Sequence, residues 1–456
     1  EEAAEDIYIN YEEKESITNL QKALNHDSPI VREELTSNLC FDWELGNQTN
    51  TEKAIEKSKF KTTINLINNR VVPNPMECRS TVGTHDNKNN KFTLYCSSQG
   101  VHSLKRKISK VFNQSEEDFN IITKDVGGGF GMKIFNYPEY ILTLAAAKLL
   151  KKPVKWKASR TESFLSDIHG RDHYSTATIG LDENYKFTAL KVTTVANLGA
   201  YLSDFAVFIP TYAGTGMLTG CYDIPYAYAN VKGAYTNTNP TDAYRGAGRP
   251  EAAYLIERIV DKAAHQLGLT APEIRRINLI DKKQMPYSTA LGHTYDSGDF
   301  KRTLEHAVNL SAYNSFEKRR TLSYKNGFLR GIGISTYIEA CGGGGPETAE
   351  IKVDDKGIVS VKIGTQSNGQ GHETSYAQIV SSVLEIDVDK IHVLQGDSTK
   401  IKKGSGTGGS RSTPVGGSAL HLATSELLEK AKVFISEHLS IEKDHITYKD
   451  GIIFYE

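Results

Sequence analysis

The sequence predicts a mixed α/β protein. Segments with the two-residue repeat of strands alternate with segments whose apolar residues recur every three or four positions, as in helices. Several of the joints between them are rich in glycine, such as 127–133, which follows a predicted strand and precedes a predicted helix. The 456 residues are enough for about three domains of ~150 residues each.

The first half of the chain supplies the clearest elements. An alternating strand is predicted near the start, at 6–13. Further strands are predicted at 91–98, 119–126 and 152–160, and a hairpin over 174–201 turns at Asp182-Glu183-Asn184. Helical spacing predicts helices at 104–114, 138–152 and 251–269. Pro138 at the start of the second helix and the lysines at its end suit the helix dipole.

A second α/β region is predicted to start near Gly327, after a charged stretch at about 281–325 that gives no prediction. Strands are expected at 327–340, 348–355, 357–367 and 390–397, helices at 369–386 and 419–436, and a hairpin at 446–456. The hairpin turns at Asp450-Gly451, a strong turn signal. The first residue is not methionine and the last strand stops abruptly, so we expect an internal piece of a longer protein.

Composition excludes several classes of protein. The net charge is -1, and no basic excess indicates nucleic acid as a partner. The longest apolar run, 140–150, contains Lys148 and is too short to be inserted across a membrane. The five cysteines are odd in number, far apart and without a Cys-x-x-Cys, which argues against disulfides, a zinc ribbon or an iron–sulfur cluster. The preferred interpretation is five buried thiols in a reducing cytoplasm.

The loop Gly127–Lys133, GGGFGMK, lies where a phosphate cradle would lie, because backbone N–H groups and a helix N-terminus attract anions. Gly127 and Lys133 are in register with a Walker A motif. Met132, however, stands in place of its second glycine, and Ile134 in place of its hydroxyl. Without that hydroxyl a magnesium ion loses a ligand, which disfavours an NTPase. A tight turn without chemistry is the simplest alternative.

Three other glycine-bearing loops carry polar side chains. Asn368–Thr374, NGQGHET, has the amide of Gln370 and the titratable ring of His372. The loop 404–418 is rich in hydroxyl groups and carries one arginine, and 242–252, DAYRGAGRPEA, carries two arginines and no obvious nucleophile. Each loop by itself could be an ordinary turn, a helix cap or a linker.

Together the four loops indicate a large, polar, anionic ligand that is held by backbone from two domains. Glycine is needed where a Cβ would hold the chain away from such a ligand. The sequence offers no cluster of Cys, His or carboxylate residues of the kind that forms a conventional metal site. A metal, if one is present, must therefore arrive with the ligand.

Seven segments match one protein family, and they follow the family's order: NRVVPNPMECRS, SSQG, DVGGGFGMK, KKPVKW, TDAYRGAGRPEA, GTQSNGQGHETSYAQIV and GSGTGGSRSTPVGGSAL. The chain resembles the molybdenum-binding large subunit of the xanthine dehydrogenase and aldehyde oxidase family, closest to the branch of carbon monoxide dehydrogenase large chains. The resemblance implies the tail of an a/b hammerhead domain at 1–50, then two large molybdopterin-binding domains at 60–310 and 327–456. The ligand would sit between the two large domains.

The cofactor implied by the resemblance is molybdopterin cytosine dinucleotide, whose dithiolene holds the molybdenum, so no side chain is expected to ligate the metal. Two residues are expected to act in catalysis. Gln99 would hydrogen-bond an oxygen on molybdenum, and Arg245 would stabilise negative charge that develops on the substrate. The residues expected to contact the cofactor are Gln99, Gly129, Phe130, Gly131, Arg245, Gly246, Gln370, Gly371, His372, Thr407, Gly409, Ser410, Arg411 and Ser412.

The reaction implied is the hydroxylation of a small molecule, an aldehyde or an aromatic N-heterocycle, with oxygen from water. Electrons would pass to iron–sulfur clusters on a small partner subunit and to FAD on a medium one, because this chain has no iron–sulfur cysteine pattern. Two such heterotrimers commonly pair in the family. The family's catalytic base, a glutamate in a Gly-Glu motif, has no match up to Glu456 and is expected beyond it.

Departures from the family pattern bear on the substrate. Carbon monoxide dehydrogenases carry a copper-binding cysteine where this chain has Gly246, and Cu(I) needs a soft ligand. Xanthine dehydrogenases usually have glutamate where Ile134 stands, and Met132 replaces a small residue, which would narrow the pocket. Three alternatives stay open: a carbon monoxide dehydrogenase large chain, a P-loop-like phosphate- or nucleotide-binding module, and a non-catalytic cofactor-binding subunit.

Overall fold

The computed structural model describes residues 5–343 and 345–455, and the chain divides into two compact units. Unit 1 comprises Glu1–Val71, His169–Ala243 and Ala247–Ile338, and unit 2 comprises Val72–Ile168, Tyr244–Gly246 and Glu339–Glu456. The domains predicted at 1–50, 60–310 and 327–456 are continuous in sequence. The units are not, and unit 2 takes residues from both of the large predicted domains.

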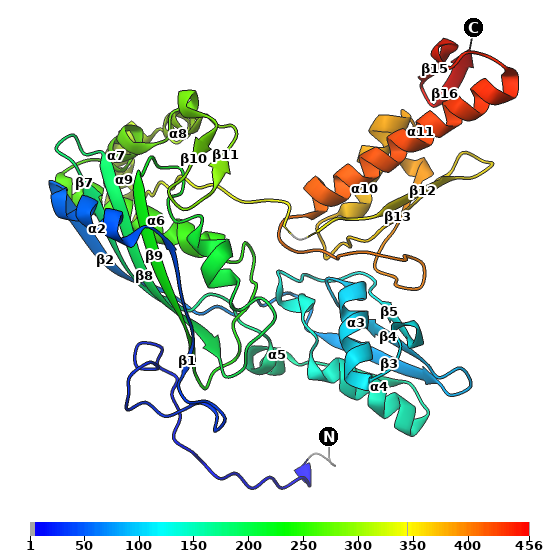
Figure 1. The fold of residues 1–456 in the computed structure, drawn as a ribbon, viewed down its shortest axis with the longest axis horizontal. Helices are drawn as coiled ribbons and strands as arrows, with labels where there is room; N and C mark the ends of the chain where they lie inside the picture. Colours follow the sequence, from blue (N-terminus) through cyan, green and yellow to red (C-terminus); the bar gives the residue numbers. More distant parts are fainter. Residues whose placement is uncertain (1–4, 344, 456) are drawn as a thin grey trace. The chain divides into compact units, whose positions relative to one another are not determined.

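Unit 1 is built on a five-stranded sheet with the strand order β1-β9-β8-β7-β2 (Figure 1). Neighbouring strands are antiparallel except β8 and β9, which are parallel. The strands are β1 (Leu39–Gly46), β2 (Phe60–Asn68), β7 (His173–Leu181), β8 (Phe187–Gly199) and β9 (Tyr226–Tyr235). The main helices of the unit are α2 (Gln48–Lys57), α6 (Arg249–Leu267), α7 (Ala271–Asn278), α8 (Phe300–Leu310) and α9 (Phe316–Lys325), and a two-stranded ribbon pairs β10 (Tyr287–Ser288) with β11 (Thr294–Tyr295).

Helix α6 shows why the apolar periodicity at 251–269 forms a helix. It packs on β2 and β7, and the buried residues on that face are Leu255, Ile256, Ile259 and Val260. Burying each large apolar side chain contributes about 1.5–3 kcal/mol, which favours the helix over other conformations of this segment. Pro250 lies in its first turn, and Gly268 ends it in the left-handed conformation.

Unit 2 contains a four-stranded sheet with the order β5-β4-β3-β6 and a three-stranded sheet with the order β12-β13-β14. Their strands are β3 (Ser80–Asp86), β4 (Lys91–Cys96), β5 (Phe119–Ile122), β6 (Val154–Lys157), β12 (Ala349–Val353), β13 (Val359–Ile363) and β14 (Ile391–Leu394). The helices are α3 (Val101–Phe112), α4 (Pro138–Leu150), α5 (Arg160–Ser166), α10 (His372–Leu384) and α11 (Ser418–Leu439). Two backbone hydrogen bonds join the end of β5 to the segment that follows β14. They run from Thr123 N to Gly396 O (2.7 Å) and from Ser398 N to Ile121 O (3.0 Å).

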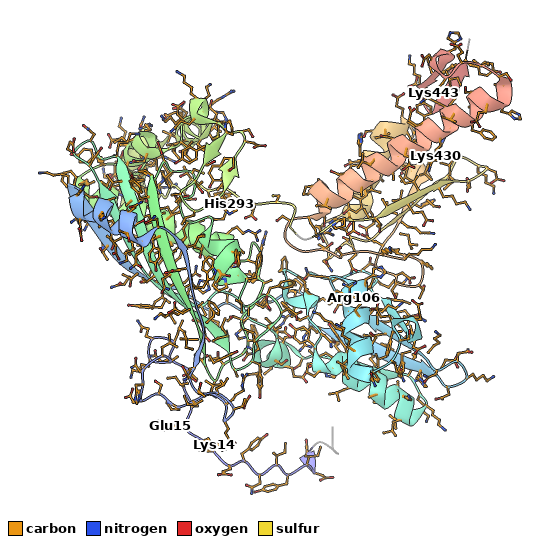
Figure 2. The ribbon with its side chains drawn as sticks, in the orientation of Figure 1. Lys14, Glu15, Arg106, His293, Lys430 and Lys443 are labelled. Carbon is orange, nitrogen blue, oxygen red and sulfur yellow. The ribbon has the colours of Figure 1, made fainter. Side chains whose placement is uncertain are left out.

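Exposed ion pairs lie along α11 and between α11 and the segment that follows it. Lys430 pairs with Glu426 at 2.7 Å along the helix. Lys443, which precedes the hairpin of β15 (Ile446–Lys449) and β16 (Ile452–Tyr455), pairs with Glu429 (Figure 2). Pairs as exposed as these contribute little, typically below about 1 kcal/mol each.

Most of the predicted elements are confirmed, within a few residues at their ends. Two predicted strands are wrong, because residues 6–13 and 327–340 form no strand. The second segment contains Gly331 and Gly333, and Leu329 within it is 92% exposed, so it gains neither a paired neighbour nor a buried face. The stretch 281–325, which gave no prediction, forms α8 and α9.

The five cysteines are free thiols, as expected, but they are not all buried. Cys96 and Cys221 are buried, and burial raises the pKa of each thiol to about 12, which keeps it protonated. Cys40 and Cys78 are half-buried and Cys341 is exposed, so the expectation of five buried thiols is wrong for these three. Among the described residues, no helix is long and apolar enough to cross a lipid bilayer.

Asp242 is a buried acid whose titration is expected to show in the stability of unit 1. It is 2% exposed and accepts hydrogen bonds from Phe205 N (2.8 Å) and Ala243 N. Burial raises the pKa of Asp242 to about 6, from 3.8. The folded state therefore binds this proton more tightly than the unfolded state, and stability falls by roughly 3 kcal/mol as the pH rises from about 4 to above 6. Asp242→Asn should remove that part of the pH dependence in urea unfolding, and an unchanged dependence would contradict the assignment.

Candidate functional site

Gln99 is the centre of the candidate site in unit 2. It lies between β4 and α3 and is 6% exposed. Its Oε1 accepts hydrogen bonds from Gly131 N (2.9 Å) and Lys133 N (3.3 Å), and its Nε2 donates to Thr407 O (3.0 Å). Its own backbone donates to Lys133 O (3.0 Å) and accepts from Thr407 N (2.7 Å). One side chain thus ties two glycine loops that are far apart in sequence.

The loop 127–133 takes a path that ordinary residues avoid. Gly129 has no room for a side chain, because a Cβ there would lie 2.5 Å from Gln99 Oε1. Phe130 adopts a φ of +56°, in the left-handed region where a bulky residue is rare, and it is 41% exposed. Among the described residues nothing accepts a hydrogen bond from Phe130 N. Strain of this kind persists where the surroundings enforce it, commonly at functional sites.

Lys133 does not act as a P-loop lysine in this structure. Its side chain is fully buried, and Nζ donates to Glu77 Oε2 (2.8 Å) and Glu77 O (2.9 Å). Burial lowers the pKa of Lys133, and the neighbouring Glu77 opposes that shift without cancelling it. The ammonium therefore faces a carboxylate inside the protein and not a phosphate outside it, which counts against the nucleotide-binding alternative. Met132 is also fully buried, so it fills the interior instead of narrowing a pocket.

Two amide side chains that the sequence did not single out lie beside Gln99. Gln366 Nε2 and Asn368 Nδ2 both donate to Ser98 O, at 2.7 and 2.9 Å. Their oxygens, Gln366 Oε1 and Asn368 Oδ1, are buried without a hydrogen-bond partner among the described residues. Buried unpaired acceptors are rare and costly, so these two oxygens are suited to accept hydrogen bonds from a bound group. The clustering of amide residues in TQSNGQ was the available signal.

Gly371 and His372 begin α10, and the start of this helix is suited to bind an anion. Gly371, with a φ of +74°, is the N-cap of α10 and offers no capping side chain, so the first N–H groups of the helix stay available to a ligand. His372 is 4% exposed, its ring stacks on Tyr376 at 4.9 Å, and its Nδ1 is buried without a partner among the described residues. Burial lowers the pKa of His372, which keeps the ring neutral. Gln370 is exposed and its Oε1 accepts from Asn368 N.

Arg411 holds its own loop together. It is 3% exposed, pairs with Glu347 Oε2 (2.5 Å), and donates to Gly406 O (3.0 Å) and Gly345 O (3.0 Å). The sequence predicted this guanidinium as a cofactor ligand, but most of its donors are engaged inside unit 2. Glu347 is a residue that the sequence analysis missed, because nothing local marks it.

The remaining predicted residues of this loop lie next to it. Thr407 Oγ1 donates to Gln366 O (2.6 Å) and lies 3.3 Å from Ser412 Oγ. The carbonyls of Gly409 and Ser410 accept hydrogen bonds from neighbouring backbone, while both residues are exposed. The loop therefore presents backbone and hydroxyl groups outward from an anchored base.

Arg245 and Gly246 also belong to unit 2, although the chain around them belongs to unit 1. Arg245 N donates to Phe130 O (2.9 Å), and the guanidinium lies over the Phe130 ring at 5.7 Å. Arg245 is exposed, and Gly246 has a φ of +89°, which favours glycine. All four loops singled out in the sequence thus contribute residues to one compact unit.

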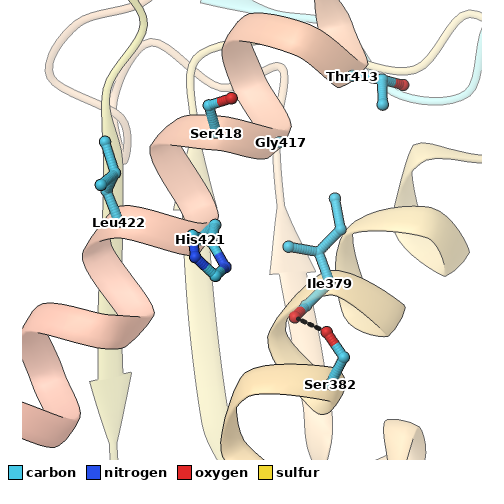
Figure 3. Close-up of a pocket in the computed structure, with 7 residues that line it drawn as sticks. All are labelled: Ile379, Ser382, Thr413, Gly417, Ser418, His421 and Leu422. Atoms are coloured by element: carbon cyan, nitrogen blue, oxygen red, sulfur yellow. Dashed lines mark hydrogen bonds between the residues drawn. The ribbon is translucent and has the colours of Figure 1, made fainter.

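Two hollows adjoin these loops. One, of about 410 Å³, is lined by residues 123–126, which follow β5, by the loop residues Gln366, Ser367, Gly369 and Gly371, and by residues 393–395 with Glu373. The other, of about 580 Å³, lies between α10 and α11 and is lined by Ile379, Ser382, Thr413, Gly417, Ser418, His421 and Leu422 (Figure 3). The first is the better match to the site, because its lining includes the glycines before α10 and Gln366, whose Oε1 has no partner among the described residues.

The donor set of the site is made of backbone N–H groups, amides and hydroxyls. Within the described residues, no group of three or more His, Cys, Asp or Glu side chains is placed to hold a metal ion. Such a site recognises a large polar ligand through many hydrogen bonds. Two matches with models of the molybdopterin cofactor-binding domain, over residues 31–279 and 306–456, decide which family this is.

The chain belongs to the molybdopterin cofactor-binding family. It is 33% identical, over 98% of its length, to the carbon monoxide dehydrogenase large chain of Hydrogenophaga pseudoflava. It is 30% identical, over 84% of its length and 48% of the relative, to the nicotine 6-hydroxylase large subunit of Paenarthrobacter nicotinovorans. This molybdopterin-binding chain spans 59% of the length of the carbon monoxide dehydrogenase relatives.

Solved structures confirm the fold of the molybdopterin-binding chain. The Cu,Mo-CO dehydrogenase matches with a TM-score of 0.91 and 29% identity, over 100% of this chain and 61% of the matched chain. Quinoline 2-oxidoreductase from Pseudomonas putida 86 matches with a TM-score of 0.92 and 26% identity, over 100% of this chain and 59% of the matched chain. The mixed α/β fold with molybdopterin-binding domains is therefore confirmed.

Proposed function

We propose that this chain is the molybdenum-binding part of an enzyme that hydroxylates an aldehyde or an aromatic N-heterocycle with oxygen from water. The observation that carries the proposal is the meeting of loops 127–133 and 404–412 at Gln99 and of loop 366–372 at the preceding residue, Ser98, with buried acceptors that have no partner among the described residues. Relatives named for nicotine and quinoline, both aromatic N-heterocycles, favour the second substrate class.

Molybdopterin fits the residues present. A pterin ring carries amide and amino N–H donors, which suit the unpaired oxygens of Gln366 and Asn368. Its phosphate suits the uncapped start of α10 at Gly371 and His372. We propose the cytosine dinucleotide form, with its far end at Thr407–Ser412. When bound, the cofactor would supply the molybdenum at which oxygen is transferred and two electrons are taken up.

The chain's own residues would orient the substrate and the cofactor. Gln99 has one Nε2 hydrogen beyond its bond to Thr407 O, and this would be donated toward the metal's oxygen ligand. The backbone N–H of Phe130 would donate a hydrogen bond in the same direction. Arg245 would place positive charge where negative charge develops on the substrate. The proton acceptor is proposed to be the family's Gly-Glu glutamate, beyond residue 456.

Partners complete the proposal. The relatives from Hydrogenophaga pseudoflava and Paenarthrobacter nicotinovorans are a large chain and a large subunit by name. We propose a small subunit with iron–sulfur clusters and a medium subunit with FAD, in cytoplasmic heterotrimers that pair.

A carbon monoxide dehydrogenase is the second candidate, because those large chains are the relatives at 33% and 30% identity. The solved relative is described as containing copper as well as molybdenum. Gly246 offers no thiolate at the position the family uses for copper, and its backbone at φ +89° disfavours a cysteine there.

Elemental analysis distinguishes the candidates. The full-length subunit, purified with its neighbours from a host that makes the cofactor, should contain about one molybdenum per chain and no copper. Oxidation of aldehydes and N-heterocycles would then be screened with an artificial electron acceptor. Stoichiometric copper would favour oxidation of CO, and the absence of molybdenum would overturn the proposal.

Arg245→Ala is expected to lower kcat by about 100-fold while molybdenum content stays at the wild-type level, because the charge acts on the reacting substrate and not on cofactor retention. Arg245→Lys should recover only part of the rate, since an ammonium lacks the planar fork of the guanidinium. Steady-state kinetics with metal analysis of the same samples checks this. Equal loss of molybdenum and activity would assign Arg245 to cofactor binding instead.

A further inference from the structure

Glu77 is a carboxylate that touches both ends of the loop 127–133. Its Oε2 accepts a hydrogen bond from Gly127 N (2.8 Å) and from Lys133 Nζ (2.8 Å). Its backbone contributes as well, because Glu77 N donates to Gly127 O (3.1 Å) and Glu77 O accepts from Lys133 Nζ (2.9 Å). The first residue of the loop and the last are thus held by one side chain.

The close contact depends on the residue type at the loop's start. A Cβ on Gly127 would lie 2.6 Å from Glu77 Cβ, so glycine is what allows the two backbones to approach. Lys133 is fully buried while the Glu77 side chain is 33% exposed, so one partner anchors in the interior and the other remains near the surface.

The segment that carries Glu77 is itself fixed. Arg79, two residues on, is fully buried and pairs with Asp167 (2.6 Å) and Glu139 (2.7 Å). On the other side, Arg160 donates to Asn74 Oδ1 (2.6 Å), Pro75 O (2.7 Å) and Met76 O (3.0 Å). A carboxylate on so rigid a support sets the position of what it binds.

The loop's far end is anchored independently. Tyr137 lies under the Arg79 guanidinium, which is 3.6 Å from the centre of its ring, and Tyr137 Oη donates to Met132 O (2.8 Å). Met132 immediately precedes Lys133. The base of the loop is therefore fixed at Gly127, Met132 and Lys133, and the strained part, 129–131, is what remains between these points and Gln99.

We propose that Glu77 and Lys133 form an ionic clasp that positions the Gly127–Lys133 loop, and through Gly131 and Lys133 the Gln99 amide, for the molybdenum cofactor. They are positioning residues, since neither is assigned a contact with the cofactor. This inference rests on the proposed function, because it concerns the site where that cofactor is held.

The experiment separates positioning from stability. Glu77→Gln, Lys133→Met and the double variant Glu77→Met with Lys133→Met are compared with wild type in the complete purified complex. Each single variant leaves a buried or half-buried charge unpaired and should lower the unfolding temperature. The double variant removes both charges and should recover most of the stability, since apolar replacement of a whole ion pair is often nearly neutral.

The effect of the clasp on the cofactor site is measured without catalytic turnover. In the double variant we expect molybdenum to dissociate about tenfold faster than in wild type, the Mo(V) electron paramagnetic resonance signal to change shape, and amide hydrogen exchange to rise at 127–133. Glu350→Gln, which breaks the exposed pair with Lys362, is the matched control and should change none of these.

The outcomes are distinguishable from failure of the proposed function. Absence of molybdenum in the wild-type complex would refute the proposed function and, with it, this inference. Molybdenum in wild type, together with a double variant that matches wild type in dissociation rate and spectrum, would show that the pair serves stability alone and would overturn the clasp.

Discussion

Gly406→Ala is expected to leave the protein folded but to weaken its retention of the molybdenum cofactor. Gly406 has a φ of +73°, and a Cβ there would lie 2.4 Å from Gln99 O and 2.7 Å from Gly100 Cα. Both are backbone atoms, so no change of rotamer relieves the overlap, and the loop must move away from Gln99. The movement breaks the bonds from Thr407 N to Gln99 O (2.7 Å) and from Gln99 Nε2 to Thr407 O (3.0 Å). At about 1 kcal/mol each, their loss corresponds to roughly thirtyfold weaker retention.

Gly357→Ala is the control for this prediction. Gly357 has nearly the same backbone conformation, with a φ of +75°, but no atom lies within 4 Å of a Cβ at that position. Both variants carry the left-handed strain of about 1–2 kcal/mol, and only Gly406→Ala carries the overlap. Molybdenum per chain and the unfolding temperature are measured on both purified proteins. Equal molybdenum in the two variants would show that the contact between 405–407 and Gln99 does not hold the cofactor site.

The sequence identified the loops of the site because glycine placement is a local property. GGGFGMK, NGQGHET and the loop at 404–418 each join regular elements and contain glycines that the backbone requires, at positive φ or in close contact. The structure joins two of these loops at Gln99, which the resemblance had named, and joins NGQGHET to the neighbouring Ser98 and to Gly128. Local signals were sufficient to say where backbone is offered to a ligand.

Which charged side chains face the ligand could not be predicted in the same way. Lys133 and Arg411 both lie in glycine loops, and both looked available for an anion. Each is buried against a carboxylate far away in sequence: Glu77 is 56 residues from Lys133, and Glu347 is 64 residues from Arg411. Only the tertiary fold places these partners, so the sequence could not distinguish a ligand-binding cation from one that holds its own loop.

The division of the chain into two units could not be predicted from the sequence either, because it also depends on the tertiary fold. Residues 244–246 belong to unit 2, but their neighbours in sequence on both sides belong to unit 1. A change of composition marks a boundary only where the chain passes from one unit to another once. The strand predicted at 327–340 is wrong for a related reason, because alternation of side chains alone does not supply a partner strand.

The pair between Arg411 and Glu347 leads to the second large expected effect, which is on stability. Arg411→Met should lower the free energy of unfolding by about 3–5 kcal/mol, because the Glu347 side chain, which is fully buried, would lose its counter-charge. Glu347 Oε2 also accepts from Ser405 N (3.3 Å), so the start of the loop is loosened as well. Lys362→Met, which breaks an exposed pair with Glu350, should cost less than about 1 kcal/mol in the same urea titration.

Combining Arg411→Met with Glu347→Gln tests what Arg411 does for the cofactor. No charge is left unpaired in this double variant, so most of the lost stability should return, and the loop backbone should again be held near Gln99. If Arg411 acts only by holding its loop, the double variant regains molybdenum together with stability. If Arg411 binds the anionic end of the cofactor, as the sequence predicted, stability returns while molybdenum does not. The structure favours the first outcome, because Arg411 is 3% exposed and donates to Glu347, Gly406 and Gly345 within unit 2.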